Sequence, residues 1–143
     1  MLADDKSLPN ELRWLIALRV YNLQPWFISR QRNEYEFAST AFGYEDINNR
    51  AVFTFARRQD CDDFAGLEIV DGVVRPNVIY FHPVFGSGPT PAPRTWDIVC
   101  GEYADVFAFL ADVIAPAMRD WALTEDAADI DYDYREAKPQ DGG

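Results

Sequence analysis

The side chains best able to do chemistry are few, and they form no familiar catalytic pattern. His82 is the only histidine, so a Ser–His–Asp or Cys–His mechanism would have to use it. It follows an apolar run and precedes Pro83, which places it at the end of a strand. The cysteines, Cys61 and Cys100, lie in no motif that would pair a thiol with this imidazole. We therefore expect no enzyme activity, and a small enzyme that uses His82 with a carboxylate such as Asp97 is the less favoured alternative.

The sequence also argues against a bound metal or cofactor. One histidine and two separated cysteines cannot supply the usual ligands of a zinc site. The acidic run at residues 129–133 imitates the start of a calcium loop, but Tyr134 stands where glycine is needed and Gln140 where the bidentate glutamate is needed. Residues 86–88 resemble a piece of a phosphate-binding loop, yet prolines follow in place of a lysine and a helix. We expect no metal and no cofactor.

A cluster of acidic residues offers a different chemistry, the docking of a basic partner. It lies between two strand-like runs, directly after Arg57 and Arg58, and consists of Asp60, Asp62 and Asp63. The arginines could neutralise these carboxylates within a charged hairpin loop. Alternatively, the carboxylates form an acidic patch that sets the rate and orientation of association with basic side chains of a partner.

Buried aromatic side chains carry most of the affinity in protein interfaces. Most of the 21 aromatic residues (4 Trp, 7 Tyr and 10 Phe) must lie in the core. Phe85 and Trp96 flank a loop rich in proline and glycine, and we expect these two aromatics to remain on the surface. The predicted partner-binding residues are therefore the three aspartates together with Phe85 and Trp96.

The elements that position these residues begin with a helix. Ser7 is a favourable N-cap, Pro9 suits a first turn, and apolar residues recur at helical spacing from residue 8 to residue 23, where Pro25 would end the helix. Residues 26–28 read as extended. Residues 34–38 alternate polar and apolar, which predicts a half-buried strand.

Strands dominate the middle of the chain. The sequence predicts strands at residues 51–56, 64–70 and 96–100, and a return strand that starts at residues 73–74, is interrupted at Pro76-Asn77 and continues at residues 78–81. Asp71-Gly72 is a strong signal for a tight hairpin turn, and Pro76 suits an edge or a bulge.

A second helix is expected from Glu102 to Trp121, kinked or divided by Pro116. Its predicted buried face consists of Tyr103, Val106, Phe107, Leu110, Val113 and Ile114. These elements predict an α+β fold with one domain at residues 1–122, in which N- and C-terminal helices pack on a mainly antiparallel sheet. Residues 123–143 read as an acidic, flexible tail.

Composition narrows the class of partner. The 143 residues carry a net charge of −11, and 48% of them are hydrophobic, enough for a core without metal or disulfide support. Residues 1–122 hold 17 acids and 11 bases, and residues 123–143 hold 7 acids and 2 bases, so the predicted domain is itself acidic. This charge repels nucleic acid and favours a basic protein partner.

The acidic N-terminus and the lack of a long apolar run predict a cytoplasmic protein with reduced thiols and no membrane segment. The oligomeric state stays open.

Four segments of the chain resemble the SUKH superfamily, the bacterial Smi/Knr-like proteins. Leu8-Pro9-x-Glu11-Leu12-Arg13-x-Leu15-Ile16 is similar to the family's first helix. The runs at residues 64–69 and 78–82 are similar to its paired strands, and Val106-x-x-Phe109-Leu110 resembles the entry to its last helix. The likeness spans about residues 8 to 115. The chain departs from the family at residues 21–25, where a glycine-containing turn is often found, and at Val106, where the family has an aromatic residue.

The resemblance implies a SUKH-like α+β domain without catalytic residues. Many members resemble immunity proteins that bind and neutralise toxins, commonly nucleases, and others are regulatory or scaffold proteins. We therefore expect an immunity protein that binds a cognate toxin directly, with an intracellular regulatory or scaffold module as the alternative.

Overall fold

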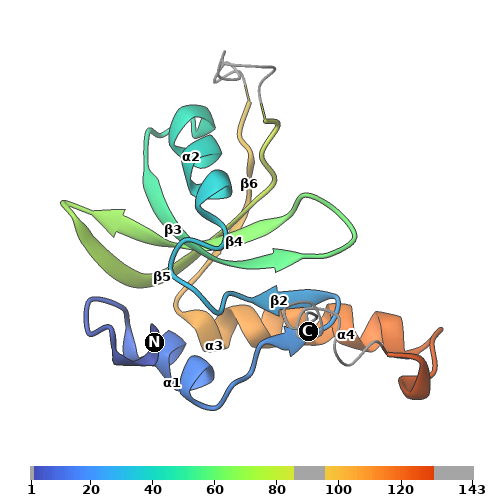
Figure 1. Ribbon diagram of the computed structural model, residues 1–143. Coiled ribbons are helices and arrows are strands. Elements are labelled where there is room, and N and C mark those ends of the chain that lie inside the picture. Colours follow the sequence, from blue (N-terminus) through green and yellow to red (C-terminus); the bar gives the residue numbers. More distant parts are fainter. Residues whose placement is uncertain (1, 86–95, 131–143) are drawn as a thin grey trace, which may run out of the picture.

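A six-stranded antiparallel sheet with the order β1-β2-β3-β4-β5-β6 organises the part of the chain that the structure describes, residues 2–85 and 96–130 of a computed structural model. Figure 1 shows the sheet with helices on both sides. The strands are β1 (Asn22–Leu23), β2 (Trp26–Ile28), β3 (Ala51–Arg58), β4 (Phe64–Val70), β5 (Val73–Phe81) and β6 (Val99–Tyr103). The predicted single-domain α+β class is confirmed, as are the extended segment at residues 26–28 and the central strands.

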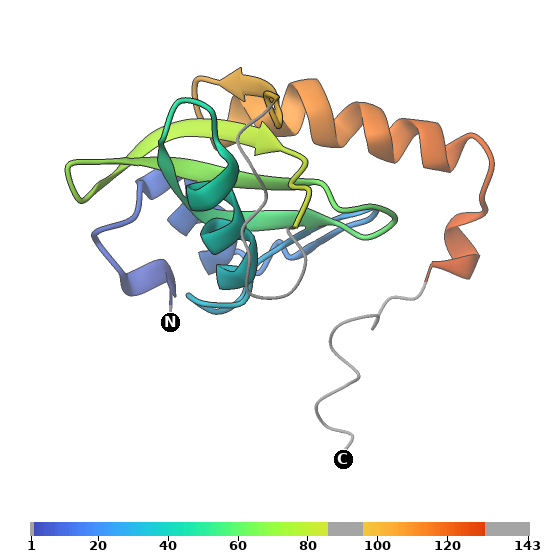
Figure 2. The same ribbon diagram turned by 90° about the horizontal axis from the view of Figure 1, so that it is seen from above.

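The terminal helices cover one face of the sheet. They are α1 (Asn10–Ala17) and a continuous C-terminal run formed by α3 (Val106–Phe109), the π-helical turn η2 (Leu110–Ile114) and α4 (Ala115–Ala122). The larger core lies beneath them and includes Leu12, Ile16, Trp26, Phe55 and Phe109. Figure 2 shows the C-terminal run projecting past the strands, with the short turn η3 (Ala127–Asp129) hanging from its end.

The opposite face is covered by α2 (Glu36–Glu45), where the sequence predicted a strand over residues 34–38. That prediction was wrong. The buried residues of this segment, Tyr35, Ala38 and Phe42, recur at spacings of three and four, which is the helical period. Phe42 packs on Phe81 in a second, smaller core. The sheet is therefore covered on both faces. The two helices expected from the sequence, at the N- and C-terminal ends, lie on the same face.

The first helix is shorter than expected. It begins after Pro9, and the chain leaves it at Arg19, which has a φ of 59°. Ser7 does not cap it, because its hydroxyl hydrogen-bonds to Asp5 instead. Val20 and Leu23 still pack against the larger core, but from a non-helical segment. The apolar stripe thus predicted burial correctly and the helix length wrongly.

The β4–β5 hairpin forms as predicted. Asp71 and Gly72 have φ angles of 51° and 77°, as a tight turn with two left-handed residues requires. Pro76 lies where the pairing shifts between Leu67 and Ile69, and β6 pairs with β5 only from Val78 onward. The proline therefore occupies a bulge at an unpaired edge, where its missing N–H removes no ladder hydrogen bond.

The last strand and helix begin later than the sequence suggested. Residues 99–103 form β6, and the helix starts at Val106 after Asp105, whose carboxylate accepts a hydrogen bond from the N–H of Ala108 at 2.8 Å. The division near Pro116 is confirmed, because the π-helical turn directly precedes α4. Phe107 is 44% exposed and was wrongly placed on the buried face, whereas Phe109 is fully buried.

An ion-pair network ties α2 to the sheet. Asp46, at the end of α2, is fully buried and accepts hydrogen bonds from the backbone and guanidinium of Arg50 at 2.9 Å each. Arg50 also contacts Glu102 of β6 at 2.8 Å. Burial raises the pKa of Asp46, but the hydrogen bonds from Arg50 outweigh it and hold the pKa below its ordinary value.

Candidate functional site

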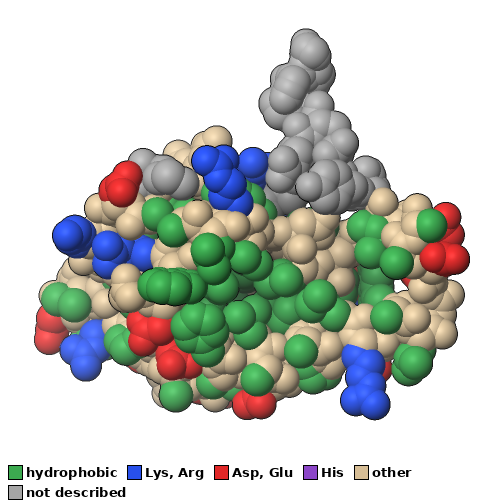
Figure 3. Space-filling model, turned by 90° about the horizontal axis from the view of Figure 1, so that it is seen from below, with side chains coloured by type: hydrophobic (Ala, Val, Ile, Leu, Met, Phe, Trp, Pro, Cys, Tyr) green, Lys and Arg blue, Asp and Glu red, His purple; other side chains and the backbone are tan. Residues whose placement is uncertain are grey.

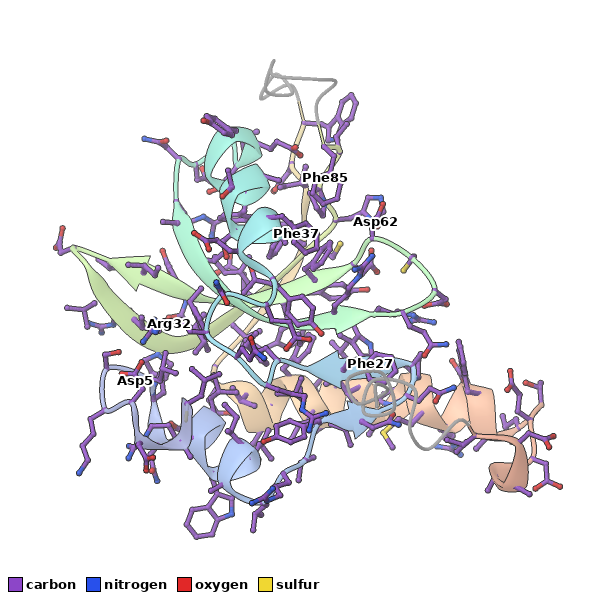
Figure 4. All side chains as sticks on the ribbon, viewed as in Figure 1. Asp5, Phe27, Arg32, Phe37, Asp62 and Phe85 are labelled. Atoms are coloured by element: carbon purple, nitrogen blue, oxygen red, sulfur yellow. The ribbon has the colours of Figure 1, made fainter. Side chains whose placement is uncertain are left out.

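The predicted acidic patch is largely paired within the protein. In the β3–β4 loop, Asp60 contacts Arg58 at 2.6 Å and Asp62 contacts Arg57 at 3.8 Å. Partial burial raises the pKa of Asp60, but the hydrogen bond from Arg58 outweighs it and lowers the pKa. Of the two interpretations of this loop, the geometry favours a self-neutralised hairpin end. Asp62 is the more open carboxylate of these two (Figure 4).

The third aspartate joins the loop to β5. Asp63 accepts a hydrogen bond from the hydroxyl of Tyr80 at 2.6 Å and lies 2.7 Å from Nδ1 of His82. Burial, and then the hydrogen bond to Asp63, raises the pKa of Tyr80. His82 therefore has a carboxylate partner, but it is Asp63 and not Asp97, whose carboxylate accepts from the N–H of Val99. Asp63 is thus committed to contacts inside the chain.

The thiols near this network are poorly activated. Burial, and then the charges of Asp63 and Asp60, raises the pKa of Cys61 to about 11. Burial and the charge of Asp63 also raise the pKa of Cys100. A thiol with a raised pKa is mostly protonated near neutral pH, and the protonated form is a weak nucleophile. The surroundings of His82 therefore lack an activated cysteine.

The two predicted surface aromatics differ in exposure. Phe85 is half-buried and stacks on Phe37, with ring centroids 6.1 Å apart (Figure 4). Its N–H and that of Val84 donate to the buried carboxylate of Glu45 at 2.9 and 2.6 Å. Phe85 thus belongs to the edge of the smaller core, whereas Trp96 is 61% exposed. The structure does not unite the five predicted residues in one open patch.

A more continuous apolar surface lies on the outer side of the terminal helices. Trp14 is 57% exposed, and Phe107 of α3 lies beside it, because both residues line a shallow depression. Leu18, 61% exposed, follows Trp14 by one helical turn on the same side of α1. We call these three residues the helical face. Figure 3, which views the molecule from below, shows hydrophobic side chains gathered in a band across this side. Large contiguous apolar patches on soluble proteins mark interaction sites.

The band continues to a groove beside the last helix. The groove has a volume of about 530 Å³ and lies between the β1–β2 turn, α4 and residues 125–130. Its lining includes Gln24, Ala115, Met118, Trp121, Ala122 and Ile130. Figure 3 shows this hollow between the body of the molecule and the small lobe formed after α4. We call it the α4 groove.

The C-terminal helical segment around this groove is acidic. Residues 105–130 hold one basic residue, Arg119, against the six acids Asp105, Asp112, Asp120, Glu125, Asp126 and Asp129. Glu125 and Asp126 line the groove itself. The apolar surface is therefore edged by negative charge, a combination that suits a basic partner.

Neither apolar surface was predicted from the sequence. A signal for one of them was present, because Trp14 and Leu18 lie on the side of the helix opposite the buried stripe of Leu12, Leu15 and Ile16. The α4 groove had no such signal, since it depends on the turn that follows α4.

The described residues contain no group of three or more potential metal ligands. In the same part of the chain, every helix is too short or too polar to cross a bilayer. Comparison of the chain with protein-family models, with curated proteins and with solved structures gives no match.

Proposed function

We propose that this protein is a non-catalytic binding domain whose partner is a basic protein, and that its specific role is to neutralise a toxin as an immunity protein. The observation that carries the binding role is the helical face, where Trp14, Leu18 and Phe107 lie together in solvent. Exposing large apolar side chains is unfavourable, and tryptophan and other aromatics are the residues that most often dominate interface energies.

The acidic character of the chain supports a basic partner. A net charge of −11 accelerates association with a positively charged protein and opposes association with nucleic acid. In this proposal the acids of residues 105–130 supply negative charge that steers a basic partner, and the helical face supplies the affinity. The narrower role as an immunity protein rests on the resemblance to SUKH proteins, and a regulatory or scaffold module is the second candidate within the same binding class.

Co-expression tests the immunity role. The toxin to use is the one encoded beside this protein's gene, because an immunity gene accompanies its toxin gene. We expect the wild-type protein to restore growth and Trp14→Ala to lose this protection. Tyr44→Ala is the matched control, because Tyr44 is an aromatic residue of similar exposure (53%) on α2, across the sheet.

Each outcome has a clear meaning. Protection that survives Trp14→Ala and Leu18→Ala together would refute the helical face as the binding surface. Failure of the wild-type protein to protect, or a neighbouring gene that encodes no toxin, would refute the immunity role and favour the regulatory module. His82→Ala tests the catalytic alternative, since the Asp63–His82 pair is the arrangement that favours it: lost protection with an unchanged fold would support that alternative.

A further inference from the structure

We propose that the α4 groove binds a basic amphipathic helix of the partner, with one apolar side chain of that helix inserted among Met118, Trp121 and Ile130. This inference rests on the proposed binding function and assigns it a second, separate contact site. The groove is a site in its own right, because its volume of about 530 Å³ falls within the range of ligand pockets.

The walls of the groove suit a helix. The exposed residues Ala115, Met118 and Ala122 are spaced by three and four along α4 and form a ridge parallel to its axis. The two alanines let another helix approach closely, and the methionine between them can adapt to its side chains. An amphipathic helix in an apolar groove is recognised through residues at this same spacing.

The charge of the rim selects a basic helix. Glu125 and Asp126 line the groove, and Arg119 is the one basic residue among its described lining residues. A partner helix with lysine or arginine beside its apolar anchor would place positive charge against these carboxylates. A second copy of this chain would instead bring two acidic C-terminal segments together, which like-charge repulsion opposes.

A polar side chain in the wall is also available to a bound helix. Gln24 lines the groove, and its Oε1 is buried without a hydrogen-bond partner among the described residues. Buried acceptors left unpaired cost free energy. Rotation of this amide toward the groove would let a donor of the bound helix satisfy it.

Direct binding of designed peptides tests the proposal. The probe is a synthetic amphipathic helix of leucine and lysine, about 15 residues long so that it can form a helix. A matched leucine–glutamate peptide tests the charge requirement. Affinity is measured by calorimetry, with the full chain and at two salt concentrations.

We expect the basic peptide to bind and the acidic peptide to bind at least about tenfold more weakly. Met118→Asp and the double variant Glu125→Lys/Asp126→Lys should each weaken the basic peptide at least about tenfold, while Met118→Leu should retain its affinity. Glu36→Lys is the charge-reversal control, because Glu36 is exposed on α2 away from the groove, and it should change affinity by less than about twofold. Circular dichroism establishes that each variant is folded.

Four results would overturn the proposal. The first is equal affinity for the basic and the acidic peptide, and the second is a loss of affinity in the Glu36→Lys control as large as in the groove variants. The third is binding of the apolar dye anilinonaphthalene sulfonate in the groove without any peptide binding. The fourth is a dimer of this chain that dissociates when Met118 is replaced by aspartate. Failure here is distinguishable from failure of the proposed function. Toxin protection that requires Trp14 but is unaffected by Met118→Asp would leave the binding function intact and remove only the groove.

Discussion

Two phenylalanines on the same helix give the sharpest test of how the terminal helices are oriented. Phe109 is fully buried, and its ring makes edge contacts with Trp26, Tyr80 and Tyr103 at centroid distances of 5.2 to 5.9 Å. Phe107, two residues earlier, is 44% exposed. Replacing each by alanine removes the same atoms from opposite environments, so the difference in unfolding free energy reports the orientation alone.

The expected magnitudes differ widely. Phe109→Ala loses the transfer free energy of a buried ring and leaves a cavity, which together cost about 3 to 5 kcal/mol. For a chain of this size that corresponds to a melting temperature lower by about 12 to 20 °C. Phe107→Ala should lower the unfolding free energy by less than about 1 kcal/mol. Because Phe107 belongs to the helical face, this variant should instead weaken binding of the partner.

Urea denaturation followed by far-ultraviolet circular dichroism measures both effects, because that signal comes mainly from the backbone of the helices and strands. The two variants should have the same dependence on urea and different midpoints. Equal losses of stability in the two variants, or a larger loss for Phe107→Ala, would show that the helix is rotated relative to the structure described here and would remove the basis for the helical face.

Two further predictions concern stability. Asp46→Asn should lower the unfolding free energy by about 3 kcal/mol at neutral pH, because it leaves Arg50 without its buried partner. Since the folded-state pKa of Asp46 is lowered, the stabilisation by its charge is lost at low pH. In urea titrations the difference in unfolding free energy between wild type and variant should therefore shrink as the pH falls below about 4. Gly66→Ala should cost about 1 to 3 kcal/mol, because a Cβ there would lie 2.8 Å from Cβ of Val52. Gly43→Ala should instead stabilise α2 by up to about 1 kcal/mol, because a Cβ there would meet no heavy atom within 4 Å apart from its chain neighbours and the backbone of its own helix. Similar calorimetric melting shifts for both variants would contradict this reasoning.

The sequence predicted well those elements whose signals are local. The Asp71-Gly72 turn carries its own backbone preference, and the central strands carry long β-rich runs that are buried on both sides. The strand predicted at residues 34–38 was wrong because five alternating residues are compatible with a strand. The helical spacing of the buried residues becomes visible only when Phe42 is included. The surroundings of the candidate binding residues could not be predicted for another reason. The three aspartates looked available as a group, and the partners that occupy them include Tyr80 and His82, which are distant in sequence.

The orientation of the C-terminal helix shows why periodicity could not identify the helical face. Val106, Leu110 and Ile114 run along its predicted apolar side, and at about 100° per residue Phe107 lies closer to the centre of that side than Phe109 does. Sequence spacing therefore favours burial of Phe107, and the π-helical turn at Leu110–Ile114 departs from this period. The structure distinguishes them through the aromatic cluster that the sheet presents, since Trp26 and Tyr80 lie where only Phe109 can reach them. Phe107 is left in solvent beside Trp14 as a consequence, so the surface proposed to bind the partner is determined by the packing of the core on the other side of the same helix.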